Sequence, residues 1–456
     1  LIGGAVVRIV VWAQNRSLFL DEANLARNFY EKDFGAFFGP LEHGQYAPPL
    51  FCLIQKCLVL LLGHREYALR LFPLVCSLVS LPLFYRLARR LISNNWVLLA
   101  TVWIFSFADI FLRYASEGKQ YGCDLTVALA LIVLAWWQTE NPFRPLACAL
   151  TGAAAIWMSM PAVFVLGGAG LLFILQARRE KDWANIPTVL WVTGVWVCSF
   201  AVYYVLLLRP SMGEGNLVAS HSAWFFPLLP TSAAQWLQVR DLLLVFPYHT
   251  AGFTALALAS GSLGILPGLW FFLRQKKREA LLLIVPVLAC ILASGLRQYS
   301  LISRMVLWTL PLVLLVQATG WQAWWSAGGR YLRPLWLLLW LAAAGLQTGW
   351  QYVYKPFVIE EIRPVLDEIA GDFQPGDVLY VHAEAWPAVY YYQECHAQRG
   401  RYPFHTRRIK AEWNTRPDTV TLQAGNDRPK RIWLAYSHAS NIRAHLREIH
   451  YVGRPP

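Results

Sequence analysis

The stretch Leu18-Phe-Leu-Asp-Glu-Ala-Asn-Leu-Ala-Arg-Asn28 places two neighbouring acids, Asp21 and Glu22, at the end of an apolar segment and continues as an amphipathic helix. Most of the remaining chain is apolar enough to lie in a membrane. A carboxylate pair at the edge of a bilayer is costly unless it has a function. The same pair could instead begin a helix, with Asp21 as its N-cap and both acids stabilised by the helix dipole. Spacing alone does not separate these two interpretations.

The composition predicts a polytopic α-helical membrane protein. Of the 456 residues, 57% are hydrophobic and 15% are charged, which is too apolar for a soluble protein of this length. The formal net charge of +13 does not indicate nucleic-acid binding, because the basic residues form short clusters between apolar runs instead of one basic face. Such spacing is what the positive-inside rule produces.

Basic clusters on alternate loops set the predicted topology. If those loops are cytoplasmic, residues 1–350 contain about eleven transmembrane helices, with interfacial helices in the first outer loop at about 14–62. The first apolar run, residues 1–13, is shorter than the ~20 residues needed to span a bilayer. We therefore expect it to be the outer end of a spanning helix that begins before Leu1. Residues 209–250 are predicted to form a long polar outer loop.

Residues 351–456 are polar and are predicted to form a small soluble α/β domain. Helical spacing covers residues 360–370 and 386–392, and strand patterns cover 378–381 and 431–436, with a further helix from about Asn441. The segment Gln374-Pro-Gly-Asp377 is predicted to be a turn. In the predicted topology the protein lies in the inner (cell) membrane and this domain is extracytoplasmic. We expect the domain to cap the outer face of the membrane-embedded part.

The same topology places four polar clusters on the outer side: Asp21 with Glu22, residues 43–46, residues 113–121 and residues 297–304. Loops that are distant in sequence can converge on one cavity at the membrane surface. Acids in such a cavity could activate a hydroxyl or hold a divalent cation, and arginine and lysine side chains suit a phosphate. An apolar floor in contact with lipid would suit a substrate with a long hydrocarbon tail.

Several motifs are shared with a known family. Leu18-Phe-Leu-Asp-Glu-Ala23 is similar to a Leu-Trp-x-Asp-Glu-Ala signature, and Arg113-Tyr-Ala-Ser-Glu-Gly-Lys-Gln-Tyr121 to a Tyr-Ser-x-Glu-Ala-Arg-x-Tyr stretch. These signatures belong to the C-type (GT-C) polyprenyl-phosphate-dependent glycosyltransferases, which include the protein O-mannosyltransferases and the lipid A aminoarabinose transferase. The resemblance covers roughly the first third of the chain well and continues in Ala47-Pro-Pro-Leu50, in Glu66-Tyr-Ala-Leu-Arg-Leu-Phe-Pro73 and in Arg304.

The resemblance implies transfer of a sugar from a polyprenyl-phosphate-linked donor to a lipid, glycan or protein acceptor on the extracytoplasmic face. Asp21 would then take the proton of the acceptor, or bind Mg²⁺ or Mn²⁺ if the reaction uses a cation, and Glu22 would orient the acceptor. Two departures from the family pattern affect the donor contacts. Lys119 stands where many relatives have arginine, and Gly118 replaces a usual alanine.

The remaining candidate residues each have an alternative explanation. Arg304, Lys119 and Arg113 would bind the donor phosphate, although an arginine at the end of a membrane span also serves as an interfacial anchor. Four residues are predicted to line the substrate site. For two of them, His43 and Tyr46, a place in a solvated loop is the more common explanation. The four are Glu117, Tyr121, His43 and Tyr46.

Other features leave a rival function open. His221 and His249 lack metal-ligand spacing and are predicted to be ordinary loop residues. The alternative to an enzyme is a non-catalytic transporter or lipid-binding scaffold. Inverted repeats or broken helices near the bilayer midplane are typical of transporters, and the sequence shows neither.

Overall fold

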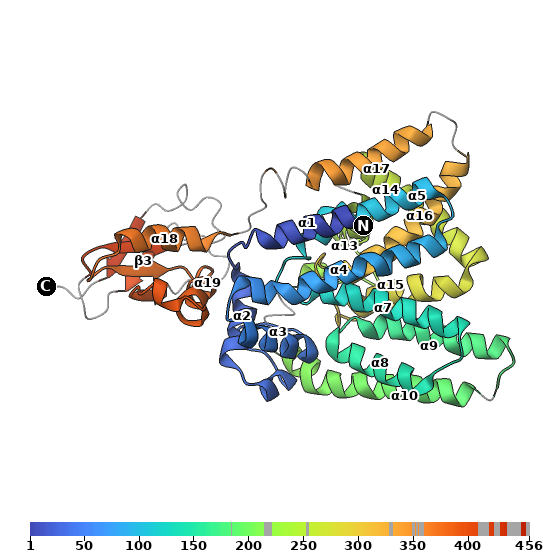
Figure 1. Cartoon of the computed structure of the whole chain (residues 1–456), viewed down its shortest axis with the longest axis horizontal. Coiled ribbons are helices and arrows are strands. Elements are labelled where there is room, and N and C mark those ends of the chain that lie inside the picture. Colours follow the sequence, from blue (N-terminus) through green and yellow to red (C-terminus); the bar gives the residue numbers. More distant parts are fainter. Residues whose placement is uncertain are drawn as a thin grey trace.

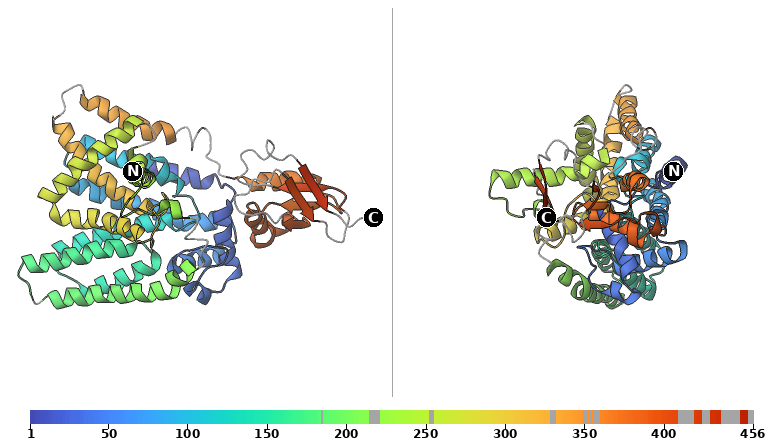
Figure 2. Two further views of the ribbon diagram at one scale, coloured as in Figure 1. Left: turned by 180° about the vertical axis from the view of Figure 1, so that it is seen from behind. Right: turned by 90° about the vertical axis from the view of Figure 1, so that its left-hand side faces the viewer.

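A computed structural model shows a bundle of helices joined at one end to a smaller unit that contains β-strands (Figure 1). The left view of Figure 2 shows the same division from behind. We call residues 360–452 the C-terminal unit. The structure describes residues 1–183, 185–213, 221–251, 255–327, 332–348, 352, 354, 360–408, 419–423, 429–435 and 448–452.

The first part of the bundle follows the apolar runs of the sequence. Its helices are α1 (Ile2–Ala13), α2 (Leu20–Glu31), η1 (Phe34–Phe38), α3 (Pro49–Leu62), α4 (Glu66–Leu91), α5 (Asn95–Phe107), α6 (Asp109–Arg113) and α7 (Tyr121–Glu140). Local sequence sets several of these boundaries. The Asn94 side chain caps α5 by accepting hydrogen bonds from two backbone N–H groups, and α3 has Pro49 in its first turn and ends at Gly63, where φ is +84°.

The second part of the bundle continues in the same manner. Its helices are α8 (Pro145–Met158), α9 (Ala162–Arg179), α10 (Ile186–Tyr203), η2 (Tyr204–Leu208), α11 (Arg209–Gly213), η3 (Ser222–Trp224), α13 (Ala233–Ala251), α14 (Ala255–Gln275), α15 (Lys277–Gly295), η4 (Leu307–Thr309), α16 (Leu310–Ala327) and α17 (Leu332–Thr348).

Within the described residues, five helical segments are long and apolar enough to cross a membrane. They are Glu66–Leu91, Tyr121–Glu140, Ala162–Arg179, Ile186–Ser211 and Lys277–Gly295. Shorter apolar helices, such as α1, α5 and α8, accompany them. The predicted fold class, a helical membrane protein with a small α/β unit, is confirmed, whereas the total of about eleven spans stays a prediction.

Basic clusters that are far apart in sequence meet at one end of the bundle. Arg90 at the end of α4 forms an ion pair with Glu140 at the end of α7. Arg278 at the start of α15 places its Nη2 3.8 Å from Oε1 of Glu180, which directly follows α9. Four helices therefore bring these charged ends together, as the alternation of basic loops in the sequence requires.

The prediction of a long polar loop over residues 209–250 was wrong in part, because this stretch contains α13. The helix packs against α14 and α16, and its Leu242 and Phe246 are buried. Arg240 and Asp241 interrupt the apolar run, but they form an exposed ion pair with each other at 2.7 Å. The charged pair therefore does not prevent the rest of the helix from packing.

The C-terminal unit contains a three-stranded parallel sheet. Its strands β1 (Val378–Val381), β2 (Thr406–Arg408) and β4 (Ile432–Ala435) have the order β2-β1-β4, with Leu379 opposite Thr406 and Trp433. A two-stranded parallel sheet pairs β3 (Thr419–Gln423) with β5 (Glu448–Val452). The helical elements are α18 (Ile362–Asp372), α19 (Trp386–Tyr390), η6 (Tyr391–Cys395) and η7 (Arg399–Arg401).

The local predictions for this unit hold where the structure describes it. The strand over 378–381 is confirmed, the second predicted strand is β4, and the Asp377 N–H donates to the Gln374 carbonyl across the predicted turn. The helix predicted from about Asn441 lies outside the described residues.

One hydrophobic core joins the C-terminal unit to the first outer segment of the bundle. Leu18 and Phe29 belong to the same buried cluster as Leu366, Tyr391 and Tyr392. The helix α19 packs against α2, the helix that carries the two acids. The C-terminal unit is therefore part of the structure that fixes the start of α2.

Candidate functional site

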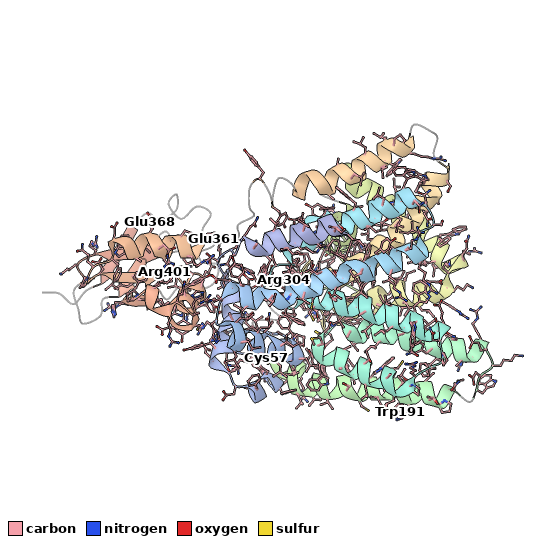
Figure 3. All side chains as sticks on the ribbon, in the orientation of Figure 1. Cys57, Trp191, Arg304, Glu361, Glu368 and Arg401 are labelled. Atoms are coloured by element: carbon pink, nitrogen blue, oxygen red, sulfur yellow. The ribbon has the colours of Figure 1, made fainter. Side chains whose placement is uncertain are left out.

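A cavity of about 190 Å³ is lined by residues from all four predicted polar clusters, and Asp21 comes from the first of them. Figure 3 places Arg304, one of its lining residues, near the end of the bundle that faces the C-terminal unit. The other polar residues of the wall are Asp21, Gln45, Tyr46, Lys119, Gln120, Tyr121, Asp124, Ser211, His221, Arg297, Gln298, Tyr299 and Ser300.

Asp21 lies on the cavity wall and is paired with a cation. Its Oδ2 accepts a hydrogen bond from Arg304 Nη1 at 2.7 Å, although the two residues are 283 positions apart. The side chains are 28% and 30% exposed, so the pair is open to the cavity. The helix begins at Leu20 after Phe19, which makes no side-chain cap, so Asp21 is not the N-cap. It still benefits from the helix dipole, because it lies in the first turn.

Glu22 is the next residue, yet its carboxylate is buried in the protein. Arg70 donates to Glu22 Oε1 and Oε2 at 2.9 and 2.6 Å, and the Gly118 N–H donates to Oε1 at 2.6 Å. The side chains of Glu22 and Arg70 are both 3% exposed. Glu22 does not line the cavity. The role predicted for Glu22, orienting the acceptor, would not be a direct contact from this position, because the carboxylate is already bound on both oxygens.

Gly118 explains one departure from the family motif. A Cβ atom at this position would lie 3.3 Å from Glu22 Oε1, which is tighter than an ordinary contact. The absence of a side chain lets the backbone N–H approach the carboxylate closely. Glycine in place of alanine therefore supports the Glu22–Arg70 pair and does not form part of the cavity wall.

Lys119, Tyr46 and Tyr121 are the other predicted residues that line the cavity. Lys119 Nζ donates to Gln45 Oε1, and the Tyr46 hydroxyl is hydrogen-bonded to that of Tyr203. Burial lowers the pKa of Lys119, and Arg304 lowers it further, while nearby acids oppose both effects. A bound anion would relieve this strain on the ammonium group.

Three further predicted residues are not on the cavity wall. His43 Nε2 lies 2.8 Å from Glu31 Oε2 in an exposed pair, and the Arg113 guanidinium lies 5.7 Å from the ring centroid of Tyr114. Glu117 is buried behind the wall. Burial raises the pKa of Glu117 and the charge of Glu22 raises it further, against the effect of nearby cations. The structure thus does not place His43, Arg113 or Glu117 where they would touch a ligand in this cavity.

Several cavity residues were missed as individual candidates from the sequence. Gln45 and Arg297 lie inside predicted clusters, so their positions were covered but their roles were not. His221 was predicted to be an ordinary loop residue, yet it lines the wall; burial lowers its pKa and so does Arg304, whereas Asp21 raises it. Asp124 is an acid in the first turn of the apolar helix α7. That placement was a usable signal, because ionisable residues in membrane spans are rare and functional.

The segment before Asp21 is held from both sides. Glu361 of the C-terminal unit accepts hydrogen bonds from the Ser17 N–H and hydroxyl, the latter at 2.6 Å, and Figure 3 shows Glu361 at the junction of the two units. The Tyr392 hydroxyl accepts from the Leu18 N–H at 2.9 Å and donates to Glu66 at 2.8 Å. Arg70 donates to the carbonyls of residues 16 and 17. Asp21 therefore extends from a rigid support.

The donor atoms do not form a metal site in the described part of the chain, where no three His, Cys, Asp or Glu side chains gather. Asp21 contributes one carboxylate, and Arg304 binds it. A divalent cation prefers several oxygen ligands. A divalent cation at Asp21, which the sequence left as a possibility, therefore does not fit these residues.

Comparison with known proteins reveals similarity at the level of structure. No protein-family model matches the sequence, and no curated protein matches it significantly. Crystal structures of ArnT from Cupriavidus metallidurans are similar in fold: the apo state has a TM-score of 0.53 and the state bound to undecaprenyl phosphate 0.52, both at 14% identity over 89% of this chain. The alignments cover 84% and 85% of the two ArnT chains.

This chain has the C-type glycosyltransferase fold. A crystal structure of the Archaeoglobus fulgidus oligosaccharyltransferase in complex with zinc and sulfate is also similar, with a TM-score of 0.46 and 13% identity, over 98% of this chain and 61% of that one. The C-type fold and the five apolar helices make the protein an integral membrane protein, as predicted.

Proposed function

We propose that the protein transfers a sugar from a polyprenyl-phosphate donor to an acceptor hydroxyl or amine. The observation that carries this proposal is the Asp21–Arg304 pair on the wall of a cavity that also contains Lys119. The cavity combines a carboxylate that can accept a proton with cations that suit a phosphate. The similar ArnT structure contains undecaprenyl phosphate, which is a ligand of this class.

In the proposed reaction Asp21 is the general base. Its carboxylate takes the proton of the acceptor while the acceptor oxygen or nitrogen forms a bond to the anomeric carbon. The bond from that carbon to the phosphate oxygen breaks, and its electron pair leaves with the polyprenyl phosphate. Attack on the face opposite the leaving group inverts the configuration of the anomeric carbon.

Arg304 and Lys119 stabilise the leaving phosphate, where negative charge grows in the transition state. A guanidinium has five N–H donors, and Asp21 takes one of them in the structure. Arg304 can therefore contact Asp21 and a phosphate oxygen together. A phosphate would also attract Arg304 away from Asp21, which leaves the carboxylate better able to accept a proton.

We assign the cavity to the extracytoplasmic side of the inner membrane. The basic ends of α4, α9 and α15 support this assignment, because clusters of lysine and arginine favour the cytoplasmic side. The cavity and the C-terminal unit would then both be extracytoplasmic, and the acceptor would be a lipid, glycan or protein reached from that side.

The proposal is tested with the purified full chain in liposomes, supplied with undecaprenyl phosphate that carries radiolabelled glucose, mannose or aminoarabinose. Release of unlabelled undecaprenyl phosphate and appearance of label on an added membrane extract are expected for at least one donor. Asp21→Asn should slow the transfer by about 10²- to 10⁴-fold, while Asp241→Asn, which alters an exposed Asp–Arg pair on α13, should not slow it. A transporter or scaffold would leave every donor intact in all three proteins.

A further inference from the structure

Asp124 is a buried acid that the proposed reaction does not use. It lies in the first turn of α7, is 7% exposed and lines the cavity. Within the part of the chain that the structure describes, the hydroxyl of Ser159 lies near its carboxyl, but neither Asp124 Oδ1 nor that hydroxyl makes a hydrogen bond of normal geometry. Burying an acceptor without a donor is costly. The position is therefore expensive unless a ligand supplies the missing donor.

A second buried acceptor lies on the same wall. The Gln120 side chain donates from Nε2 to the Tyr46 carbonyl at 3.1 Å, which orients its Oε1. That oxygen also makes no hydrogen bond to any described residue, and Gln120 is buried and lines the cavity. Two unsatisfied acceptors, four residues apart in sequence, belong to residues that line the same cavity. Their complement is a ligand with at least two hydrogen-bond donors.

The parts of a polyprenyl-phosphate donor differ in what they can offer these acceptors. The hydrocarbon tail has no polar hydrogen, and the phosphate presents acceptor oxygens, which cannot donate a hydrogen bond to these groups. The sugar carries several hydroxyl groups and, in some sugars, an amine. It is attached to the phosphate directly, so it must enter the same cavity when the phosphate lies at Lys119 and Arg304.

We propose that Asp124, assisted by Gln120, binds hydroxyl or amino hydrogens of the transferred sugar and so selects the donor. This inference rests on the proposed function and adds the group that recognises the sugar. Asp124 is then a binding residue with no part in proton transfer. A site that hydrogen-bonds a substrate group discriminates strongly against a ligand without it, because the buried acceptor is then left unpaired.

The test compares lipids with and without a sugar on the full chain in detergent. The probes are undecaprenyl phosphate alone and undecaprenyl phosphate that carries glucose, mannose or aminoarabinose. For the sugar lipid that the wild type binds best, Asp124→Ala should weaken binding by about 10- to 100-fold. Binding of undecaprenyl phosphate alone should stay unchanged, which also shows that the variant folds.

Two further variants complete the experiment. Glu140→Gln changes an acid at the other end of α7, in an exposed pair with Arg90, and should bind both classes of lipid as the wild type does. Asp124→Asn keeps an acceptor oxygen and loses the charge. A small loss with this variant identifies a hydroxyl as the partner, and a loss as large as that of Asp124→Ala identifies an amine.

The outcomes separate this inference from the proposed function. Equal weakening of both lipid classes by Asp124→Ala, or unchanged binding of the sugar lipid, overturns the role of Asp124 while wild-type transfer still supports the enzyme. If the wild type binds and transfers none of the sugars, the proposed function fails and the sugar site falls with it.

Discussion

Asp21 and Glu22 are neighbours in the chain, but the structure places them in opposite environments. The side chain of Asp21 is 28% exposed and forms an ion pair with Arg304 on the cavity wall. Glu22 is 3% exposed and accepts three hydrogen bonds from Arg70 and Gly118. Consecutive residues of an α-helix point about 100° apart. One turn of α2 therefore presents one acid to a ligand and the other to the protein core.

The difference teaches that an acidic pair need not act as a pair. A carboxylate that already accepts hydrogen bonds on both oxygens, with a buried counter-ion, is a structural element. A carboxylate that pairs with a cation at an open wall can exchange that partner for a ligand. Substitutions on the two sides should therefore have different effects. Those on the Glu22 side should lower the stability of the protein, and those on the Asp21 side should weaken donor binding or slow sugar transfer.

The largest effect is expected from Arg70→Met. Removing one partner of a buried ion pair leaves an uncompensated charge, which typically costs about 3–5 kcal/mol. The variant also loses the donors that hold the carbonyls of residues 16 and 17. Thermal unfolding in detergent should show a strongly destabilised protein.

Arg401→Met is the matched control for that experiment, because Arg401 pairs with Asp367 at an exposed site. Its expected cost is below about 1 kcal/mol. Equal stability of Arg70→Met and the wild type would contradict a structural role for the Glu22 side.

A smaller effect is expected from Arg304→Met, on the Asp21 side. Loss of charged hydrogen bonds to a phosphate typically costs about 1.5–3 kcal/mol, so binding of undecaprenyl phosphate should weaken by roughly 10- to 150-fold. Isothermal titration calorimetry or a lipid-displacement assay measures the affinity for undecaprenyl phosphate. Arg240→Met, at the exposed pair on α13, should bind as the wild type does. An unchanged affinity of Arg304→Met for undecaprenyl phosphate would contradict the assignment of Arg304 as a phosphate-binding residue.

The smallest effect is expected from Glu117→Gln. Glu117 is close enough to interact electrostatically with Glu22 and with Lys119 and Arg304 on the cavity wall. Its pKa is raised by burial and by Glu22, above the ordinary value of 4.5, while Arg113, Lys119 and Arg304 act in the other direction. Between the ordinary and the raised pKa, the folded protein binds more protons than the unfolded chain. Stability should therefore decrease as the pH rises through that window. Glu117→Gln should flatten the pH dependence of the unfolding temperature, and an unchanged slope would show that another group titrates.

Much of the fold could be predicted from the sequence because long apolar runs and alternating basic loops are strong signals. The meeting of distant polar clusters followed from the same alternation. The different roles of Asp21 and Glu22 were less visible, although a signal existed. Glu22 occupies one helical stripe with Leu25, Ala26 and Phe29, at spacings of three, four and seven residues, and all three are buried. A helix that buries this stripe must bury Glu22.

The parts that could not be predicted depend on tertiary contacts. The helix α13 was taken for a loop because Arg240 and Asp241 interrupt its apolar run, and its packing against α14 and α16 depends on the fold. His43 belonged to a polar cluster but pairs with Glu31, which its loop reaches only after a turn with φ of +62° at His43. The position of Asp124 in an apolar run was a signal in the sequence, but its place on the same cavity wall as Gln120 depends on the fold.

The most direct test of the central claim is a single-turnover transfer assay on Asp21→Asn, with donor binding measured on the same sample. The sugar-bearing lipid that the wild type uses is bound first, and the acceptor is then added. We predict that donor affinity is retained, since Arg304 and Lys119 remain, while the transfer rate falls by about 10²- to 10⁴-fold. A transfer rate close to that of the wild type, with donor bound, would contradict the assignment of Asp21 as the base.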